Sequence, residues 1–160
     1  MMSAFVIRAP ETEVEWNTVR QLLIDYQDEF DDKACFTSFE DEFNNLESVY
    51  AESGKYKLIA IEESTGKIVG CVAIRTLSPG VAEMKRLYLV PQYRGFQLGR
   101  KLATAIMELA TQHGYHQMLL DTMYEMKAAQ RLYEQLGFAV IPSYGYQEGL
   151  DVICYGKDLP

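Results

Sequence analysis

The stretch VPQYRGFQLGRKL, residues 90–102, joins a predicted strand to a predicted helix, and this junction decides how the chain folds. The segment VAEMKRLYLV predicts a strand that Pro91 ends, because proline lacks the N–H group that a sheet needs. After it, apolar residues recur at helical spacing until Gly114, namely Leu98, Leu102, Ala105, Ile106 and Leu109. A strand, a helix and then another strand predict a right-handed crossover and a parallel pair.

The same junction gathers positive charge at the start of a helix. The first N–H groups of a helix have no partner within it and carry partial positive charge, so they can hold a phosphate. Arg94, Arg100 and Lys101 add full charges there. The stretch is neither a P-loop nor a dinucleotide-binding motif, because GxxxxGK[ST] and GxGxxG are both missing. Taken alone, Gly95 and Gly99 could equally shape a tight turn and a helix contact.

The remaining pattern predicts an α/β fold with a mixed, mostly antiparallel sheet of about seven strands and about four helices. Helices are expected at 11–30 and 39–52, after a first strand at 4–9. Three antiparallel strands follow in succession: YKLIAIEE, KIVGCVAIRTL and VAEMKRLYLV, the first two joined by the turn signal Ser64-Thr65-Gly66. The last elements are a strand at HQMLLDT, a helix at YEMKAAQRLYEQL, and two strands at FAVI and DVICYGKDL.

Length and composition predict one globular domain over residues 1–160, since 48% of the residues are hydrophobic. No run of about 18 uncharged apolar residues occurs and no secretory signal precedes the first strand, so we expect a cytoplasmic protein without a membrane segment. The cysteines Cys35, Cys71 and Cys154 are far apart, and His113 and His116 are the only histidines. This pattern predicts reduced thiols and no metal site.

Charge is spread unevenly along the chain. The net charge is -8, and residues 1–50 hold twelve acidic residues against three basic ones. Residues 81–101 hold five basic residues against Glu83 alone. An acidic surface disfavours nucleic acid, because phosphate neutralisation supplies most of the non-specific affinity for it. A local basic region in such a chain suits a small polyanion.

Two segments in register resemble the GCN5-related N-acetyltransferase (GNAT) family. MKRLYLVPQYRGFQLGRKLA is similar to its R/Q-x-x-G-x-G/A pyrophosphate loop, matched by Arg94 and Gly99. AAQRLYEQLGF is similar to its A-x-x-L-Y-x-x-x-G-F helix, matched by Ala129, Leu132, Tyr133, Gly137 and Phe138. The likeness is close over residues 56–141. It implies a GNAT-like fold and an N-acetyltransferase that uses acetyl-CoA as co-substrate.

The resemblance also implies where acetyl-CoA binds. In the family, the strands AEMKRLYLV and HQMLLDT part, and the pantetheine arm pairs with backbone near Leu87 and Leu89. The implied binding residues are Leu87, Tyr88, Leu89, Arg94, Gly95, Phe96, Gln97, Leu98, Gly99, Arg100, Met126 and Ala129. The chain departs from its relatives in carrying Gln97 in place of a second glycine and Met126 in place of an asparagine. These departures leave open a non-catalytic acyl-CoA-binding sensor or interaction module of the same fold.

Two residues are expected to carry the chemistry. The resemblance implies that Tyr133 protonates the departing thiolate, since a phenol's pKa of about 10 lies above a thiol's of about 8.5. The helical spacing of Tyr133 fits a core position equally well. Glu83 is the candidate base, and strand alternation predicts that Glu83, Lys85, Leu87 and Leu89 share one face. The alternative for Glu83 is a salt bridge to Lys85 or Arg86, and Asp121 is a weaker candidate base.

The acceptor is expected to be a primary amine on a small molecule or peptide, without nucleic acid or membrane as a partner. Residues 11–50 correspond to the part of the family that shapes the acceptor site, and their acidity would draw a cationic amine. They could equally form a solvated helix face. Tyr144 and Tyr146 are candidates to line the acceptor pocket or to pack as core. A homodimer is one expected assembly.

Overall fold

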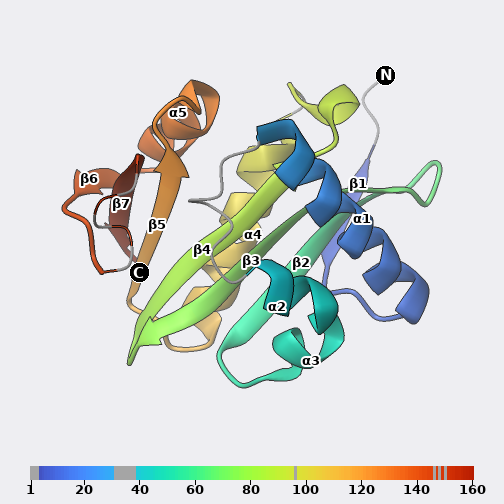
Figure 1. Ribbon diagram of the computed structural model, residues 1–160, viewed down its shortest axis with the longest axis horizontal. Helices are drawn as coiled ribbons and strands as arrows, with labels where there is room; N and C mark the ends of the chain where they lie inside the picture. The colour runs from blue at the N-terminus through green and yellow to red at the C-terminus, as the bar shows by residue number, and fades with distance from the viewer. Residues whose placement is uncertain (1–3, 31–38, 96, 146, 148, 150) are drawn as a thin grey trace.

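The computed structural model describes residues 4–30, 39–95, 97–145, 147, 149 and 151–160 (Figure 1). One sheet holds seven strands in the order β1-β2-β3-β4-β5-β7-β6. β4 and β5 are parallel, and every other neighbouring pair is antiparallel. The predicted sheet is confirmed. The strands are β1 Phe5–Arg8, β2 Lys55–Glu62, β3 Ile68–Ser78, β4 Val81–Leu89, β5 Gln117–Met123, β6 Ala139–Ile141 and β7 Val152–Asp158.

Five α-helices lie within the described residues, one more than predicted. Asn45 precedes α3 with a φ of -133° and a ψ of 35°, outside the helical region, so the expected helix at 39–52 is divided in two. Asparagine favours such breaks because its side chain competes for backbone hydrogen bonds. No helix in the described part of the chain is both long and apolar enough to cross a membrane. The helices are α1 Glu13–Phe30, α2 Phe39–Asn44, α3 Leu46–Ala51, α4 Leu98–Gln112 and α5 Lys127–Gln135, and η2 Pro91–Tyr93 is a 3-10 turn.

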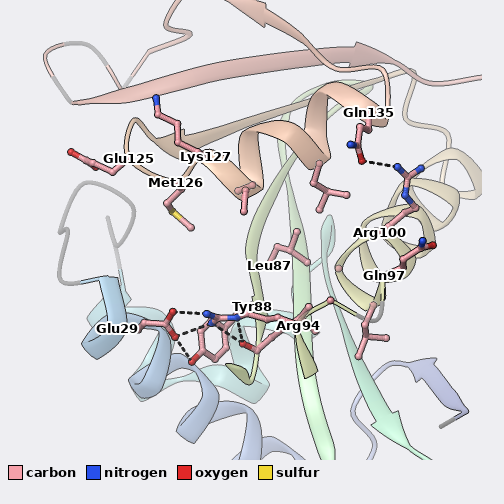
Figure 2. Close-up of a pocket in the computed structure, with 17 residues that line it drawn as sticks. Glu29, Leu87, Tyr88, Arg94, Gln97, Arg100, Glu125, Met126, Lys127 and Gln135 are labelled. Carbon is pink, nitrogen blue, oxygen red and sulfur yellow. Dashed lines mark hydrogen bonds and ion pairs between the residues drawn. The ribbon is translucent and has the colours of Figure 1, made fainter. Parts of the chain in front are cut away.

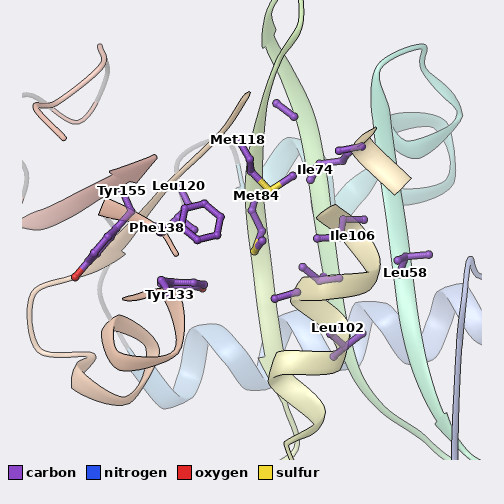
Figure 3. Close-up of a cluster of buried hydrophobic side chains, with 14 of the residues drawn as sticks. Leu58, Ile74, Met84, Leu102, Ile106, Met118, Leu120, Tyr133, Phe138 and Tyr155 are labelled. Atoms are coloured by element: carbon purple, nitrogen blue, oxygen red, sulfur yellow. The ribbon is translucent and has the colours of Figure 1, made fainter. Parts of the chain in front are cut away.

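The sheet is covered on both faces by helices (Figure 1). α4 lies against one face and packs its buried side chains on β2, β3 and β4. Figure 3 shows Leu102 and Ile106 of α4 facing the side chains of these strands. Burying each large aliphatic side chain contributes about 1.5–3 kcal/mol, which fixes α4 and its N-terminus on the sheet. The buried residues of α4 are Leu98, Leu102, Ala103, Ile106 and Ala110.

α1 and α3 cover the opposite face. Val19 and Leu23 of α1 pack with Leu46 of α3 on buried strand residues. The rings of Tyr26 and Tyr88 stack with their centroids 5.1 Å apart, which joins α1 to β4. The two helical layers therefore enclose two separate apolar cores, with β4 contributing to both.

β4 and β5 pair over only part of their length. The pairing runs from Val81 to Glu83 on β4, and from Gln117 to Leu119 on β5. Beyond it, β4 continues to Leu89 and β5 to Met123, and Figure 1 shows the two strands diverging. The sheet therefore opens at its centre, and Glu83 lies where the opening begins.

A β-bulge at Arg86 corrects the predicted alternation along β4. Arg86 has a φ of 59°. Between Lys85 and Tyr88 the chain of β4 advances by three residues, while the paired stretch of β3 advances by only two. The extra residue turns the second half of the strand over. Leu87 therefore packs with the α4 core and Tyr88 with the α1 core. The expectation that Glu83, Lys85, Leu87 and Leu89 share one face is wrong, because strict alternation holds only in a strand without a bulge.

Candidate active site

A cavity of about 720 Å³ lies between the end of β4, the start of α4 and the helix α5 (Figure 2). We refer to it as the α4–α5 cavity. Of the twelve residues expected to bind the cofactor, Phe96 lies outside the described residues and the other eleven all line this cavity. Those eleven are Leu87, Tyr88, Leu89, Arg94, Gly95, Gln97, Leu98, Gly99, Arg100, Met126 and Ala129. The structure thus brings both sequence motifs to one hollow.

The N-terminus of α4 opens into this cavity. The N-cap residue Gln97 makes no side-chain capping bond, and the N–H of Lys101 makes a helical bond to the carbonyl oxygen of Gln97 at 3.1 Å. The N–H groups of the preceding turn have no acceptor within a helix. Together with the helix dipole they form a positive end that suits an anion.

The two glycines of the loop have different roles. Gly95 has a φ of 91°, a conformation that favours glycine. A Cβ on Gly99 would lie 3.5 Å from Leu89 Cδ1 and 3.6 Å from Leu132 Cδ2, which is ordinary contact. Gly99 is therefore not needed for the turn, and its effect is to leave space in the cavity. Gln97 has a φ of 59°, so a non-glycine residue takes the left-handed conformation where relatives carry glycine.

Arg94 is held by an acidic residue that sequence reasoning missed. Its guanidinium donates to both carboxylate oxygens of Glu29, at 2.7 and 2.8 Å, and to the carbonyl oxygen of Leu89 at 2.9 and 3.1 Å. The hydrogen bond from Arg94 lowers the pKa of Glu29. Burial and the hydrogen bond to Glu29 raise the pKa of Tyr88 to about 12. Figure 2 shows these three side chains together at one end of the cavity, and no local pattern links residue 29 to residue 94.

The backbone of Leu89 faces the cavity. The N–H of Val90 donates to the carbonyl oxygen of Val69 on β3 at 2.9 Å. Neighbouring residues of an antiparallel strand point their polar groups in opposite directions, so the N–H and carbonyl of Leu89 point away from β3. The bond from Arg94 to this carbonyl agrees with that direction. An N–H at this edge can donate to a group bound in the opening of the sheet.

Glu83 is almost fully buried, with 1% of its surface exposed. It lies opposite Arg75 on β3, whose Nε donates to Glu83 Oε1 at 2.7 Å. Lys85 Nζ is 3.9 Å from the same oxygen. Arg86 instead pairs with Glu42 of α2 at 3.2 Å. Of the two salt bridges expected as alternatives, the structure therefore has the one with Lys85, and Arg75 is the closer partner.

Two described residues between β6 and β7, Tyr144 and Gln147, contact Glu83. The hydroxyl of Tyr144 donates to Glu83 Oε2 at 2.5 Å. Gln147 Nε2 lies 3.0 Å from Asp121 Oδ2 and 3.4 Å from Glu83 Oε2. The two candidate bases, Glu83 and Asp121, are thus joined by one amide. Tyr146, the other predicted pocket residue of this loop, lies outside the described residues.

Tyr133 lies in the core next to the α4–α5 cavity. Its ring contacts those of Phe138 and Tyr155, with centroids 5.9 and 6.1 Å apart (Figure 3). Its neighbour Leu132 lines the cavity, whereas Tyr133 is not among the lining residues. Tyr133 therefore occupies the core position that its helical spacing predicts. Its role as a proton donor stays a prediction.

A second cavity, of about 490 Å³, lies on the opposite face of the sheet, between α3 and the strands β3 and β4. We refer to it as the α3 cavity. Arg75 and Lys85, which contact Glu83, both line it. The described residues include no group of three or more histidine, cysteine, aspartate or glutamate side chains placed to hold a metal ion.

Comparison with known proteins places the chain in a family. The model of the acetyltransferase (GNAT) family matches residues 16–138. An uncharacterized N-acetyltransferase of Schizosaccharomyces pombe is 36% identical over 126 residues, which cover 78% of this chain and 77% of the yeast protein.

Solved structures show the same fold. A GNAT-family acetyltransferase of Staphylococcus aureus superposes with a TM-score of 0.80 at 21% identity, over 98% of this chain and 100% of that one. The PaiA N-acetyltransferase of Thermoplasma acidophilum, solved in complex with coenzyme A, gives a TM-score of 0.74 at 16% identity, over 97% and 99% of the two chains. The family model, the yeast relative and the shared fold together show that this chain belongs to the GNAT family of acetyltransferases.

Proposed function

We propose that the protein transfers an acetyl group from acetyl-CoA to a primary amine by direct attack in a ternary complex. The observation that carries the proposal is the α4–α5 cavity, which lies between the end of β4, beyond its pairing with β5, and the start of α4. The coenzyme A complex of the Thermoplasma protein supports a CoA-type co-substrate for this fold.

The positive end of α4 would hold the pyrophosphate of acetyl-CoA through backbone N–H groups. Arg100, which donates to Gln135 at 2.9 Å, adds charge at the cavity wall. Arg94 would have to exchange Glu29 for phosphate in order to contribute. The pantetheine arm would lie along β4, where the N–H of Leu89 is placed to donate to the thioester carbonyl oxygen. A donor at the atom that gains negative charge stabilises the tetrahedral intermediate.

In the proposed reaction, the neutral amine nitrogen attacks the thioester carbon. A C–N bond forms, the C–S bond breaks, and its electron pair goes to sulfur. The nitrogen gives one proton to Glu83, directly or through a water molecule, and the sulfur takes one proton to leave as the CoA thiol. Holding both reactants together in the opening of the sheet supplies much of the acceleration.

Glu83 fits the role of base because its donors keep a carboxylate oriented at the apex of the opening. The resemblance assigns Tyr133 to the proton that goes to sulfur. No covalent intermediate on the enzyme is required, and the buried thiols of Cys71 and Cys154 take no part. Burial raises the pKa of both thiols, which makes them poor nucleophiles.

One observation favours the alternative, a module that binds acyl-CoA without turnover. Glu83 is 1% exposed and already accepts hydrogen bonds from Arg75 and Tyr144, so an amine does not reach it directly in this arrangement. A protein that only binds acyl-CoA would have no need for an accessible base.

The experiment that separates the two functions measures binding and turnover on the same protein. Acetyl-CoA is titrated calorimetrically, and the release of free thiol is followed with a panel of amines. Binding together with amine-dependent thiol release supports the transferase. Binding without release from any amine supports the module, and the absence of binding would contradict both.

A further inference from the structure

The α3 cavity is positively charged although the chain is acidic overall. Its described lining carries four cationic side chains against two carboxylates, in a chain with a net charge of -8. Lys55 pairs with Glu52 at 2.6 Å. The cations are Lys55, Arg75, Lys85 and Arg86, and the carboxylates are Glu42 and Glu52. Two of the cations, Arg75 and Lys85, also form ion pairs with Glu83.

Two lysines on this side of the sheet are partly or fully withdrawn from solvent, Lys85 in the cavity wall and Lys57 beside it. Burial lowers the pKa of Lys85 and the charge of Arg86 lowers it further, while Glu83 opposes these effects only in part. Lys57 lies behind the cavity wall with 4% of its surface exposed, and its Nζ is 5.2 Å from the centre of the Tyr50 ring. This Nζ donates no hydrogen bond to any described oxygen or nitrogen. An anion bound in the cavity would stabilise both ammonium groups.

The charged end of the cavity is next to the proposed base. Arg75 Nε lies 2.7 Å and Lys85 Nζ 3.9 Å from Glu83 Oε1. An anionic group that contacts Arg75 or Lys85 is therefore held close to the carboxylate that would accept the amine proton. A small molecule with an amine and an anionic group only a few bonds apart would fit both positions at once.

We propose that the acceptor is a small amine that carries a carboxylate, an α-amino acid or a close chemical equivalent, bound in the α3 cavity with its carboxylate toward Arg75 and Lys85. The proposal rests on the proposed acetyl transfer and deepens it. A carboxylate matches the planar donor face of an arginine and forms strong, charge-assisted hydrogen bonds with it.

The same charges disfavour other acceptors. A polyamine would bring more positive charge to Lys85 and Arg86, which costs free energy because like charges repel. The amine of a lysine side chain in a protein has no carboxylate near it. Of the eight acidic residues in 11–50 whose side chains the structure describes, six are exposed, among them Asp25, Asp28 and Glu47, and Glu42 alone lines the α3 cavity.

The test compares matched acceptors by thiol release and by mass spectrometry of the product. The standard L-amino acids are assayed beside their carboxamides and the amines in which hydrogen replaces the carboxylate. The wild-type protein is expected to favour one or more amino acids over the matched amide and amine by about tenfold or more in kcat/KM. This ratio is then measured in Arg75→Gln and Lys85→Gln, with Lys67→Gln, on the turn between β2 and β3, as the matched charge control.

The ratio is expected to fall toward one in Arg75→Gln and Lys85→Gln and to stay at its wild-type value in Lys67→Gln. A role limited to positioning Glu83 would lower turnover of all three compound sets together and leave the ratio unchanged, which would overturn the inference. Amides or amines acetylated as fast as the amino acids would also overturn it, with the proposed function intact. Thiol release from none of these compounds but from a polyamine or a peptide amine would overturn the inference alone, and release from no amine of any kind would overturn the proposed function as well.

Discussion

The α4–α5 cavity and the α3 cavity share strand β4 and differ in how their walls are made. Apart from Glu29, the first is lined by two short stretches of chain, residues 87–100 and 125–135. The second is lined by isolated side chains between residues 42 and 86, which α2, α3, β2, β3 and β4 bring together. A contiguous stretch can be recognised from sequence, and a scattered set cannot.

The largest expected effect tests whether Glu83, which contacts Arg75 and Lys85 of the α3 cavity, is the base. Glu83→Gln keeps the shape of the side chain and one oxygen that can accept from Arg75 or Tyr144, but it cannot take a proton. We expect kcat to fall by about 10²- to 10⁴-fold, the usual contribution of a general base. Acetyl-CoA affinity, measured by calorimetry, should stay unchanged. A variant with wild-type kcat would remove Glu83 from the mechanism and leave Asp121 as the candidate.

The next effect tests the space beside Gly99. A leucine there would extend beyond the Cβ position between Leu89 and Leu132 and fill the cavity. We expect Gly99→Leu to weaken acetyl-CoA binding by about thirtyfold, because steric overlap costs about 2 kcal/mol. Gly99→Ala is the control, since its Cβ makes only ordinary contacts, and it should bind nearly as tightly as the wild type. Equal affinity of Gly99→Leu and Gly99→Ala would contradict the assignment of this cavity to the cofactor.

A smaller effect separates two readings of Tyr133. If its hydroxyl donates to the leaving sulfur, Tyr133→Phe should lower kcat by about tenfold, the value of one hydrogen bond, with acetyl-CoA affinity unchanged. The thermal unfolding midpoint is measured in parallel, because the ring also packs on Phe138 and Tyr155. Wild-type kcat in this variant would leave Tyr133 as a core residue only.

The smallest effect concerns Glu29, which competes with phosphate for Arg94. Glu29→Gln should release the guanidinium and tighten acetyl-CoA binding by about threefold, since an exposed ion pair is worth about 0.2–1 kcal/mol. Glu15→Gln is the matched control, because it removes a carboxylate that pairs with Arg8 at 2.6 Å and lines neither cavity. Weaker binding in Glu29→Gln would mean that the pair orders the site for its ligand.

The sequence predicts the α4–α5 cavity well because its residues are close in the chain. Arg94 and Ala129 belong to local motifs, and the change from strand to helical period after Val90 indicates where they meet. The pairing of Glu83 with Arg75 needs the register of β3 on β4, which no local pattern reveals. The contacts of Glu29 with Arg94 and of Gln147 with Asp121 join distant segments and were missed for the same reason.

The bulge at Arg86 has an evolutionary consequence. Because the extra residue turns β4 over, Lys85 in the first half lines the α3 cavity, and Leu87 and Leu89 in the second half line the α4–α5 cavity. Under the proposed function, substitutions in the first half would change the acceptor while the second half continued to serve the donor. A single strand can thus combine a constant partner with a variable one, and lineages of this fold can diverge in acceptor preference without rebuilding the donor site.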